Sequence, residues 1–380
     1  MAALILIAGS AMAVQFAGER TVDVIEGRPA QLIPDRADFV VYIWPAARAL
    51  VRSGSAKPFY GSGRGAVYPP QFVVLMAPFG LVDGSAARVL SVLLTALLVV
   101  VVALAWSRDR GQWRAGAIPL LLAAPAVMAV RLDHTMSVVG LAALTAAIFA
   151  HRRGRWYLFG MASAVALCRP ANAIPVVVMM GVAIIPRPLA FLRAALGGAL
   201  VLGLLTLVAY AWDPTWPADY QASIRQFHLV GFVRLAEIAF GSAASYLLIV
   251  LLSLPAAVAG WRNRDRALDL DRVSLLMAAT VVIANGGGLY VAVFCLPAAL
   301  RLSLRPAMAL SAWVFATVPW LAILALSPVL LSNDPGRAAP YISAMALTLP
   351  LAALPLLRRP RGALESLPPS RDSSVGRAAV

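Results

Sequence analysis

Charged residues are scarce in this chain. Asp, Glu, Lys and Arg make up 13% of it and hydrophobic residues 61%, whereas soluble domains carry roughly 25% charge. That shortage excludes an ordinary soluble domain. It predicts an all-α polytopic membrane protein, since helices satisfy their own backbone hydrogen bonds in a bilayer.

Lysine is almost absent, and acidic residues are few. There is a single Lys, and 17 acidic residues leave a net charge of +15. The arginines stand in short clusters between apolar runs, as the positive-inside rule predicts for cytoplasmic loops. No basic stretch is interleaved with aromatic residues, so the sequence predicts no nucleic-acid partner.

The chain has only two cysteines, Cys168 and Cys295, and both lie in apolar runs. We interpret them as small buried hydrophobic residues rather than a disulfide or metal pair. No Walker loop, dinucleotide fingerprint, zinc-ligand spacing or serine-hydrolase constellation is present. The sequence therefore predicts no cofactor and no metal, and it disfavours an ATP-driven pump.

The apolar runs predict about twelve transmembrane helices. The first, Ala2 to Ala17, lacks the basic start of a signal peptide, and we interpret it as a span. The others are at about 86–106, 116–130, 136–150, 156–168, 172–186, 189–211, 242–260, 273–285, 288–300, 307–326 and 340–357.

Arginine clusters fall in alternate loops, which sets the topology. We expect these loops, and both termini, to be cytoplasmic; the clusters are at 108–114, 152–155, 187–193, 262–272, 301–305 and 358–361. The external loops are then 18–70, 131–135, 169–172, 212–240, 285–288 and 327–339. The whole of 1–357 forms one transmembrane domain with a long first external loop over 18–82, and 358–380 forms a disordered cytoplasmic tail.

The first external loop holds the longest polar stretch. Residues 38–52 place apolar side chains on one side at helical spacing, which predicts a helix in the lipid interface. Lys57 to Gly65 is rich in glycine and serine and predicts a loop. Phe72 to Val82 is too short to span and predicts a re-entrant or interfacial helix.

Few carboxylates are placed for chemistry. Asp265, Asp269 and Asp271 share a loop with arginines, which predicts a solvated charge cluster. Asp213 and Asp219 stand among aromatic residues, which predicts an interface belt. Asp38 precedes the predicted interfacial helix, where it either caps that helix or acts as a general base.

Several segments resemble glycosyltransferase family 87, which includes bacterial mannosyltransferases that use polyprenyl-phosphate mannose. The similar segments are Asp38-Phe39-Val40-Val41-Tyr42, 46–50, Pro58-Phe59-Tyr60, Tyr68-Pro69-Pro70, 75–79, His151-Arg152-Arg153-Gly154-Arg155 and Cys168-Arg169-Pro170. The likeness covers roughly residues 1–200, most specifically in the first loop.

The resemblance implies a GT-C fold in a bacterial cell membrane, with an active site that faces outside. It implies that Asp38 deprotonates the acceptor hydroxyl and that Arg169, with Arg131 as a companion, binds the donor phosphate. Tyr42 and Tyr68 in the matched segments are expected to bind substrate. The partners implied are a polyprenyl-phosphate sugar donor, a glycolipid or glycan acceptor and the lipid bilayer.

The sequence also departs from the family. Asp133-His134-Thr135 stands where many relatives have Gly-Gln, which leaves the acceptor and the sugar open. We expect His134 and His228 to lie outside, where they could aid proton transfer or bind hydroxyls, although a lone histidine at a helix end is more often an interfacial polar residue. Arg169 and Arg131 could instead be interfacial anchors.

Two other function classes stay open. A transporter or lipid flippase would also have about twelve spans, although no internal two-fold repeat is evident. The other class is a non-catalytic relative of the family that binds lipid-linked sugar.

Overall fold

The computed structural model describes residues 39, 43–54, 68–107, 126, 129–130, 134–226, 244–283 and 291–303. These residues form helices and no strands, as predicted for an all-α membrane protein. The α-helices are α2 (Trp44–Ser53), α4 (Pro70–Leu75), α5 (Gly84–Ser107), α8 (Thr135–Arg152), α9 (Trp156–Ala166), α10 (Pro170–Ile184), α11 (Pro188–Trp212), α12 (Trp216–Gln226), α14 (Ala244–Arg262), α15 (Leu270–Ala279) and α16 (Leu296–Ser303). Short 3₁₀ helices are η2 (Ala77–Leu81), η4 (Thr280–Ile283) and η5 (Val291–Cys295).

Three of the described helices, α5, α8 and α11, are long and apolar enough to span a bilayer. Helix α8 is the central one, since 61% of its most apolar stretch is buried, against 22% in α11. The outward sides of α5 and α11 expose rows of leucine and valine that water would disfavour; they include Val89, Leu93, Leu97, Leu196, Leu200, Leu204 and Leu207. These rows fit contact with lipid tails.

The predicted spans at 86–106, 136–150, 189–211 and 242–260 match α5, α8, α11 and α14 within a few residues. The predicted spans at 156–168 and 172–186 match α9 and α10, which are shorter than those four helices. Where a span at 273–285 was expected, α15 ends at Ala279 and continues as η4; where one at 288–300 was expected, η5 comes first and α16 begins only at Leu296. The spans at 2–17, 307–326 and 340–357, most of 116–130 and the tail 358–380 lie outside the described residues, so the count of twelve stays a prediction.

Glycines let neighbouring helices pack closely, as is common between membrane helices. A Cβ on Gly160 of α9 would collide with the Ala194 carbonyl of α11. A Cβ on Gly260 of α14 would likewise collide with the Met179 carbonyl of α10. Backbone contact therefore joins α9 to α11 and α10 to α14.

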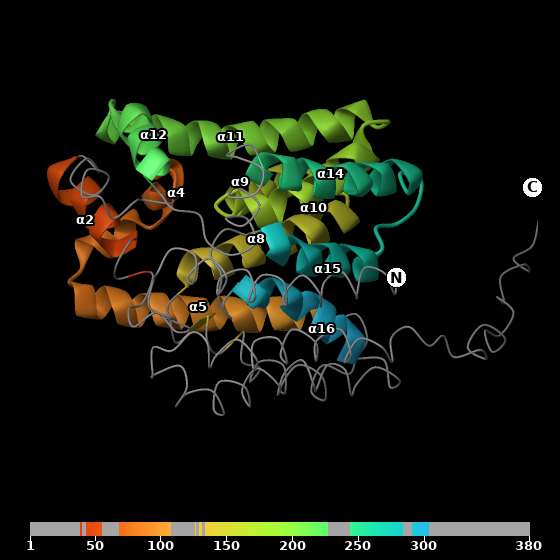
Figure 1. The fold of residues 1–380 in the computed structure, drawn as a ribbon, viewed down its shortest axis with the longest axis horizontal. Helices are drawn as coiled ribbons and strands as arrows, with labels where there is room; N and C mark the ends of the chain where they lie inside the picture. Colours follow the sequence, from red (N-terminus) through yellow and green to blue (C-terminus); the bar gives the residue numbers. More distant parts are fainter. Residues whose placement is uncertain are drawn as a thin grey trace, which may run out of the picture.

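The loops gather at two opposite ends of the bundle. In Figure 1, α2, α4 and α12 lie at the left end, and the connection from α14 to α15 lies at the right. Gly54 lies against the carbonyl of Trp212 at the first end. At the other end, His151, Arg187 and Arg264 line one pocket. Among the described residues, those predicted to be external and those predicted to be cytoplasmic thus lie at different ends.

The first-loop helices pack on each other. Helix α2 begins at Trp44 and buries Ala46, Ala47 and Leu50, the apolar side expected from the sequence. That side contacts protein, because Gly80 of η2 comes so close to the Ala47 carbonyl that a Cβ would lie 2.5 Å from its oxygen. A helix that we expected to rest on lipid therefore has its apolar face covered by η2.

The stretch predicted as one helix over 72–82 is two short ones. Helix α4 ends at Leu75 and η2 runs from Ala77 to Leu81. Pro78 explains the break, because its ring lacks an N–H and clashes with the preceding turn. Pro69 is extended, with ψ of 142°, as expected for the turn that leads into this stretch.

Candidate functional site

Arg169 lies at the centre of the candidate site. It occupies the N-cap position of α10, and Pro170 follows at the first helical position. Its Nη2 donates a hydrogen bond of 2.6 Å to Oγ of Ser137. Its Cζ lies 5.2 Å from the centre of the Tyr68 ring, which is a cation–π contact. The guanidinium therefore has a fixed place between α8 and the first-loop segment.

The turn between α9 and α10 is pressed onto the start of α8. A Cβ on Gly140 would lie 3.2 Å from Cγ of Arg169 and 3.3 Å from Sγ of Cys168. The Cys168 thiol donates to the carbonyl of Met136 at 3.5 Å. A larger residue at 140 would push against this turn, so glycine there lets Arg169 reach Ser137.

Tyr68 belongs to a buried cluster that joins the first loop to α8. Its members are Phe39, Ile43, Ala46, Ala47, Leu50, Tyr68, Phe72, Val73, Met76, Ala87, Met136 and Cys168. Phe39 stands edge-on to Phe79, with ring centres 5.1 Å apart. Phe39 is the chain neighbour of Asp38 and is fully buried. The first-loop segment is thus anchored beside Arg169 through apolar contacts.

Other polar side chains link the helices near this end. Thr95 and Thr135 share a hydrogen bond of 3.0 Å between α5 and α8. Asn172, one turn into α10, donates to Oγ1 of Thr280 at 2.9 Å, and both are buried. Buried hydroxyl and amide groups that satisfy one another fix helix positions. They hold the start of α8 and of α10 in register around Arg169.

His134 also lies at this end, where it is buried at the N-cap of α8. Its carbonyl accepts a hydrogen bond from the N–H of Ser137 at 3.0 Å. The imidazole therefore belongs to the same helical turn as the hydroxyl that holds Arg169. His134 lies at the end of the bundle that we expect to be external, and its side chain is buried there.

Tyr68 and Arg169 are the predicted site residues that the structure brings into contact. Asp38, Tyr42, Arg131 and His228 lie outside the described residues. Ser137 and Asn172 were not singled out from the sequence. The signal that could have found Ser137 is its spacing of three residues from His134, which places both in one turn of an otherwise apolar helix.

Asp213 is a described carboxylate at this end, and it is used in capping. It is buried, and its Oδ1 accepts from the N–H and the hydroxyl of Thr215 at 3.1 and 2.9 Å. Trp216 packs against Tyr210 with ring centres 5.6 Å apart, and Trp216 is itself buried. The aromatic residues here pack on protein, in addition to any contact with an interface.

The described part of the site is suited to hold an anion. An arginine guanidinium offers several N–H donors and matches the oxygens of phosphate or carboxylate. One of its N–H groups donates to Ser137, and the adjacent N-terminus of α10 adds positive potential. Within the described ranges no three His, Cys, Asp or Glu side chains are grouped to hold a metal ion.

Known proteins give no match to this chain. No protein-family model fits the sequence, and neither the curated proteins nor the solved structures include one that matches it. The likeness to glycosyltransferase family 87 therefore depends on the short segments of the sequence quoted above.

Proposed function

We propose that this chain is an integral membrane glycosyltransferase. It moves a sugar, mannose by resemblance, from a polyprenyl phosphate to a hydroxyl on a lipid- or glycan-linked acceptor at the external face. The observation that carries the proposal is the contact between Arg169 and Tyr68. These residues come from two separate segments that resemble family 87, and the fold joins them at one end of the bundle.

The chemistry of the donor explains the need for Arg169. When the sugar leaves a polyprenyl phosphate, negative charge builds up on the phosphate oxygens. A guanidinium already held by Ser137 and Tyr68 can stabilise that charge with little reorganisation. Lysine would supply the charge but not the planar set of donors.

In this proposal Asp38 is the general base. It takes the proton of the acceptor hydroxyl, whose oxygen attacks the anomeric carbon while the bond from that carbon to the phosphate oxygen breaks. The phosphate leaves with the bonding pair and is met by Arg169. One displacement of this kind inverts the anomeric configuration, and a retaining route would need a second carboxylate as nucleophile. Asp35 is the nearest carboxylate in sequence, and we expect it to be dispensable.

The architecture proposed with this function is a GT-C fold of about twelve spans, with both termini in the cytoplasm of a bacterial cell. Three observations support it. The long described helices are apolar, their exposed faces are leucine-rich, and the described arginines of the pocket lined by Arg187, Arg264, Arg266 and Arg272 lie at the end opposite Arg169.

The test is a transfer assay with the purified full-length protein and a radiolabelled polyprenyl-phosphate mannose. Asp38→Asn should abolish transfer, and Arg169→Gln should lower it by about a hundredfold, typical of losing one group that stabilises transition-state charge. Arg153→Gln, which changes an exposed arginine at the other end, is the matched control and should leave transfer unchanged. Asp35→Asn should remain active.

Three results would contradict the proposal. Undiminished transfer by Asp38→Asn would remove the assigned base. A product that keeps the anomeric configuration of the donor, judged by NMR coupling constants, would exclude the single displacement. Absence of transfer by the wild type, together with binding or movement of the lipid-linked sugar in vesicles, would favour a binding protein or a flippase.

A further inference from the structure

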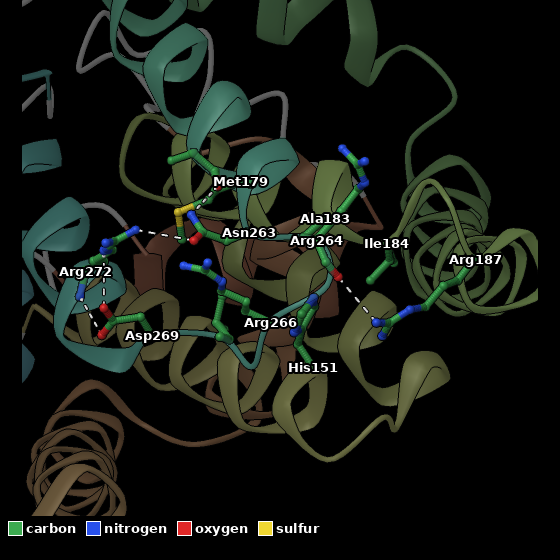
Figure 2. Close-up of a pocket in the computed structure, with 13 residues that line it drawn as sticks. His151, Met179, Ala183, Ile184, Arg187, Asn263, Arg264, Arg266, Asp269 and Arg272 are labelled. Carbon is green, nitrogen blue, oxygen red and sulfur yellow. Dashed lines mark hydrogen bonds and ion pairs between the residues drawn. The ribbon is translucent and has the colours of Figure 1, made fainter. Parts of the chain in front are cut away.

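A pocket rich in arginine opens at the end of the bundle opposite Arg169. Figure 2 shows it where α8, α10 and α14 end and where α11 and α15 begin. Its open space, including the mouth, is about 510 Å³. Its polar lining consists of Arg187, Arg264, Arg266, Arg272, Asn263 and Asp269, together with His151. The lining thus includes four arginines and one carboxylate.

The charges of this pocket are only partly balanced. Arg272 pairs with Asp269 at 3.2 Å, and Arg264 pairs with the neighbouring Asp265 at 3.6 Å. Arg187 donates to the backbone carbonyl of Arg264 at 3.3 Å, a neutral partner. The Arg266 guanidinium makes no hydrogen bond or ion pair with any described residue. Two positive charges are therefore left for a ligand.

The walls that carry these arginines are held in place. The Arg264 guanidinium stacks on Trp261 at 4.5 Å from the ring centre. Asn263 donates to the carbonyl of Ala259 at 2.7 Å and accepts from Arg272 at 3.4 Å. The backbones of α14 and α10 touch at Gly260. Arg264, Asn263 and Arg272 are therefore held in place before an anion enters, which lowers the entropy cost of binding.

The helices that line the pocket also carry exposed apolar side chains. Leu189 and Leu192 on α11 are exposed close to Arg187 in sequence, and Val258 and Trp261 are exposed on the last turns of α14. Tryptophan is favoured at the level of lipid headgroups. A phospholipid could place its headgroup among the arginines and lay its acyl chains along these apolar faces.

We propose that this pocket binds the phosphate of an anionic phospholipid headgroup. Basic pockets between membrane helices on the cytoplasmic side recognise such headgroups, and this end is the one that we expect to be cytoplasmic. The site is separate from Arg169 and does not depend on the proposed transferase activity.

The experiment is native mass spectrometry of the full-length protein in detergent, with added phosphatidylglycerol or phosphatidylcholine. The wild type should retain phosphatidylglycerol and not phosphatidylcholine. Arg187→Gln combined with Arg266→Gln should weaken retention by on the order of tenfold, because each arginine near a lipid surface contributes to the attraction. Arg153→Gln combined with Arg193→Gln removes equal charge from exposed positions outside the pocket and should change retention less than twofold.

Equal retention by the pocket variant and the wild type would overturn the proposal, as would equal losses in both double variants. Arg266→Gln alone should also weaken retention. It is the second test if the double variant misfolds, since the Arg266 side chain holds no described structural contact. Millimolar inorganic phosphate should not displace the lipid. Displacement would overturn the lipid assignment in favour of a free phosphate site.

Discussion

Nε of Arg301 and Oδ1 of Asp271 are 2.6 Å apart, and both side chains are largely withdrawn from solvent, with 10% and 15% of their surfaces exposed. The pair ties α15 to α16 at the end that holds the arginine-rich pocket. We predicted from the sequence that Asp271 belongs to a solvated charge cluster. That was wrong for Asp271, because α16 folds over it.

Asp271→Asn should destabilise the protein by about 3–5 kcal/mol, since removing one partner leaves a buried charge without its counterion. The measurement is thermal unfolding in detergent. Asp265→Asn is the control, because its side chain is 84% exposed, and surface changes of this kind usually stay within about 0.5 kcal/mol. Similar losses of stability in both variants would mean that the buried carboxylate contributes no more than the exposed one.

Gly160→Ala should also destabilise, because its Cβ would force α9 away from the Ala194 carbonyl of α11. Losses from overpacking are typically about 1–3 kcal/mol. Gly181→Ala on α10 is the matched control, since nothing lies within 4 Å of the added Cβ, and alanine favours a helix by up to about 1 kcal/mol. Unfolding curves that rank the two variants the other way would refute close packing at Gly160.

Asp83 should give a pH-dependent contribution to stability at the start of α5. Its Oδ1 accepts from the hydroxyl of Ser85 at 2.5 Å and from the N–H groups of Ser85 and Ala86, each at 2.9 Å. These bonds, the Ser85 hydroxyl first, lower the pKa of Asp83 below its ordinary value of 3.8. The stabilisation is therefore present above pH 3.8 and is lost as the pH falls through the lower folded-state pKa.

Asp83→Asn tests this contribution, because asparagine caps helices as well as aspartate but does not titrate. Between pH 5 and pH 3 the melting temperature of the wild type should fall more steeply than that of the variant. Asp265→Asn controls for the loss of one carboxylate. Parallel pH profiles for wild type and Asp83→Asn would exclude the ionised cap.

Single cysteines can report which end of the bundle lies outside. Ser53 and Ala267 are exposed at opposite ends, and the native thiols of Cys168 and Cys295 are buried and give a low background. In intact cells, Ser53→Cys should react with an impermeant thiol reagent, and Ala267→Cys should react only after permeabilisation. The reverse pattern would invert the topology and place Arg169 in the cytoplasm.

The bounds of α5 and α11 could be predicted closely, because a long apolar run with polar ends forms a helix when it crosses a bilayer. Pro78 itself indicates the break between α4 and η2. The apolar stretch around it is short, and we therefore predicted a single helix there. The Asp271 pair could not be foreseen, since local sequence does not tell which helix will cover a loop.

The site was predictable only in part. The resemblance pointed to Arg169 and Tyr68, but their contact is long-range, and periodicity carries no information about it. Ser137 was overlooked because a serine in a helix more often bonds its own backbone. Asn172 was hidden for a similar reason: its partner, Thr280, comes from a distant helix end.

The different burial of Arg169 and of the pocket arginines has a consequence for how their ligands respond to ionic strength. Arg169, at the N-cap of α10 and beneath the first-loop cluster, is half-buried, whereas Arg187 and Arg266 are exposed. Dissolved salt screens exposed charges far more than enclosed ones. Raising the salt concentration should therefore release a ligand from the arginine pocket well before it weakens an anion held by Arg169.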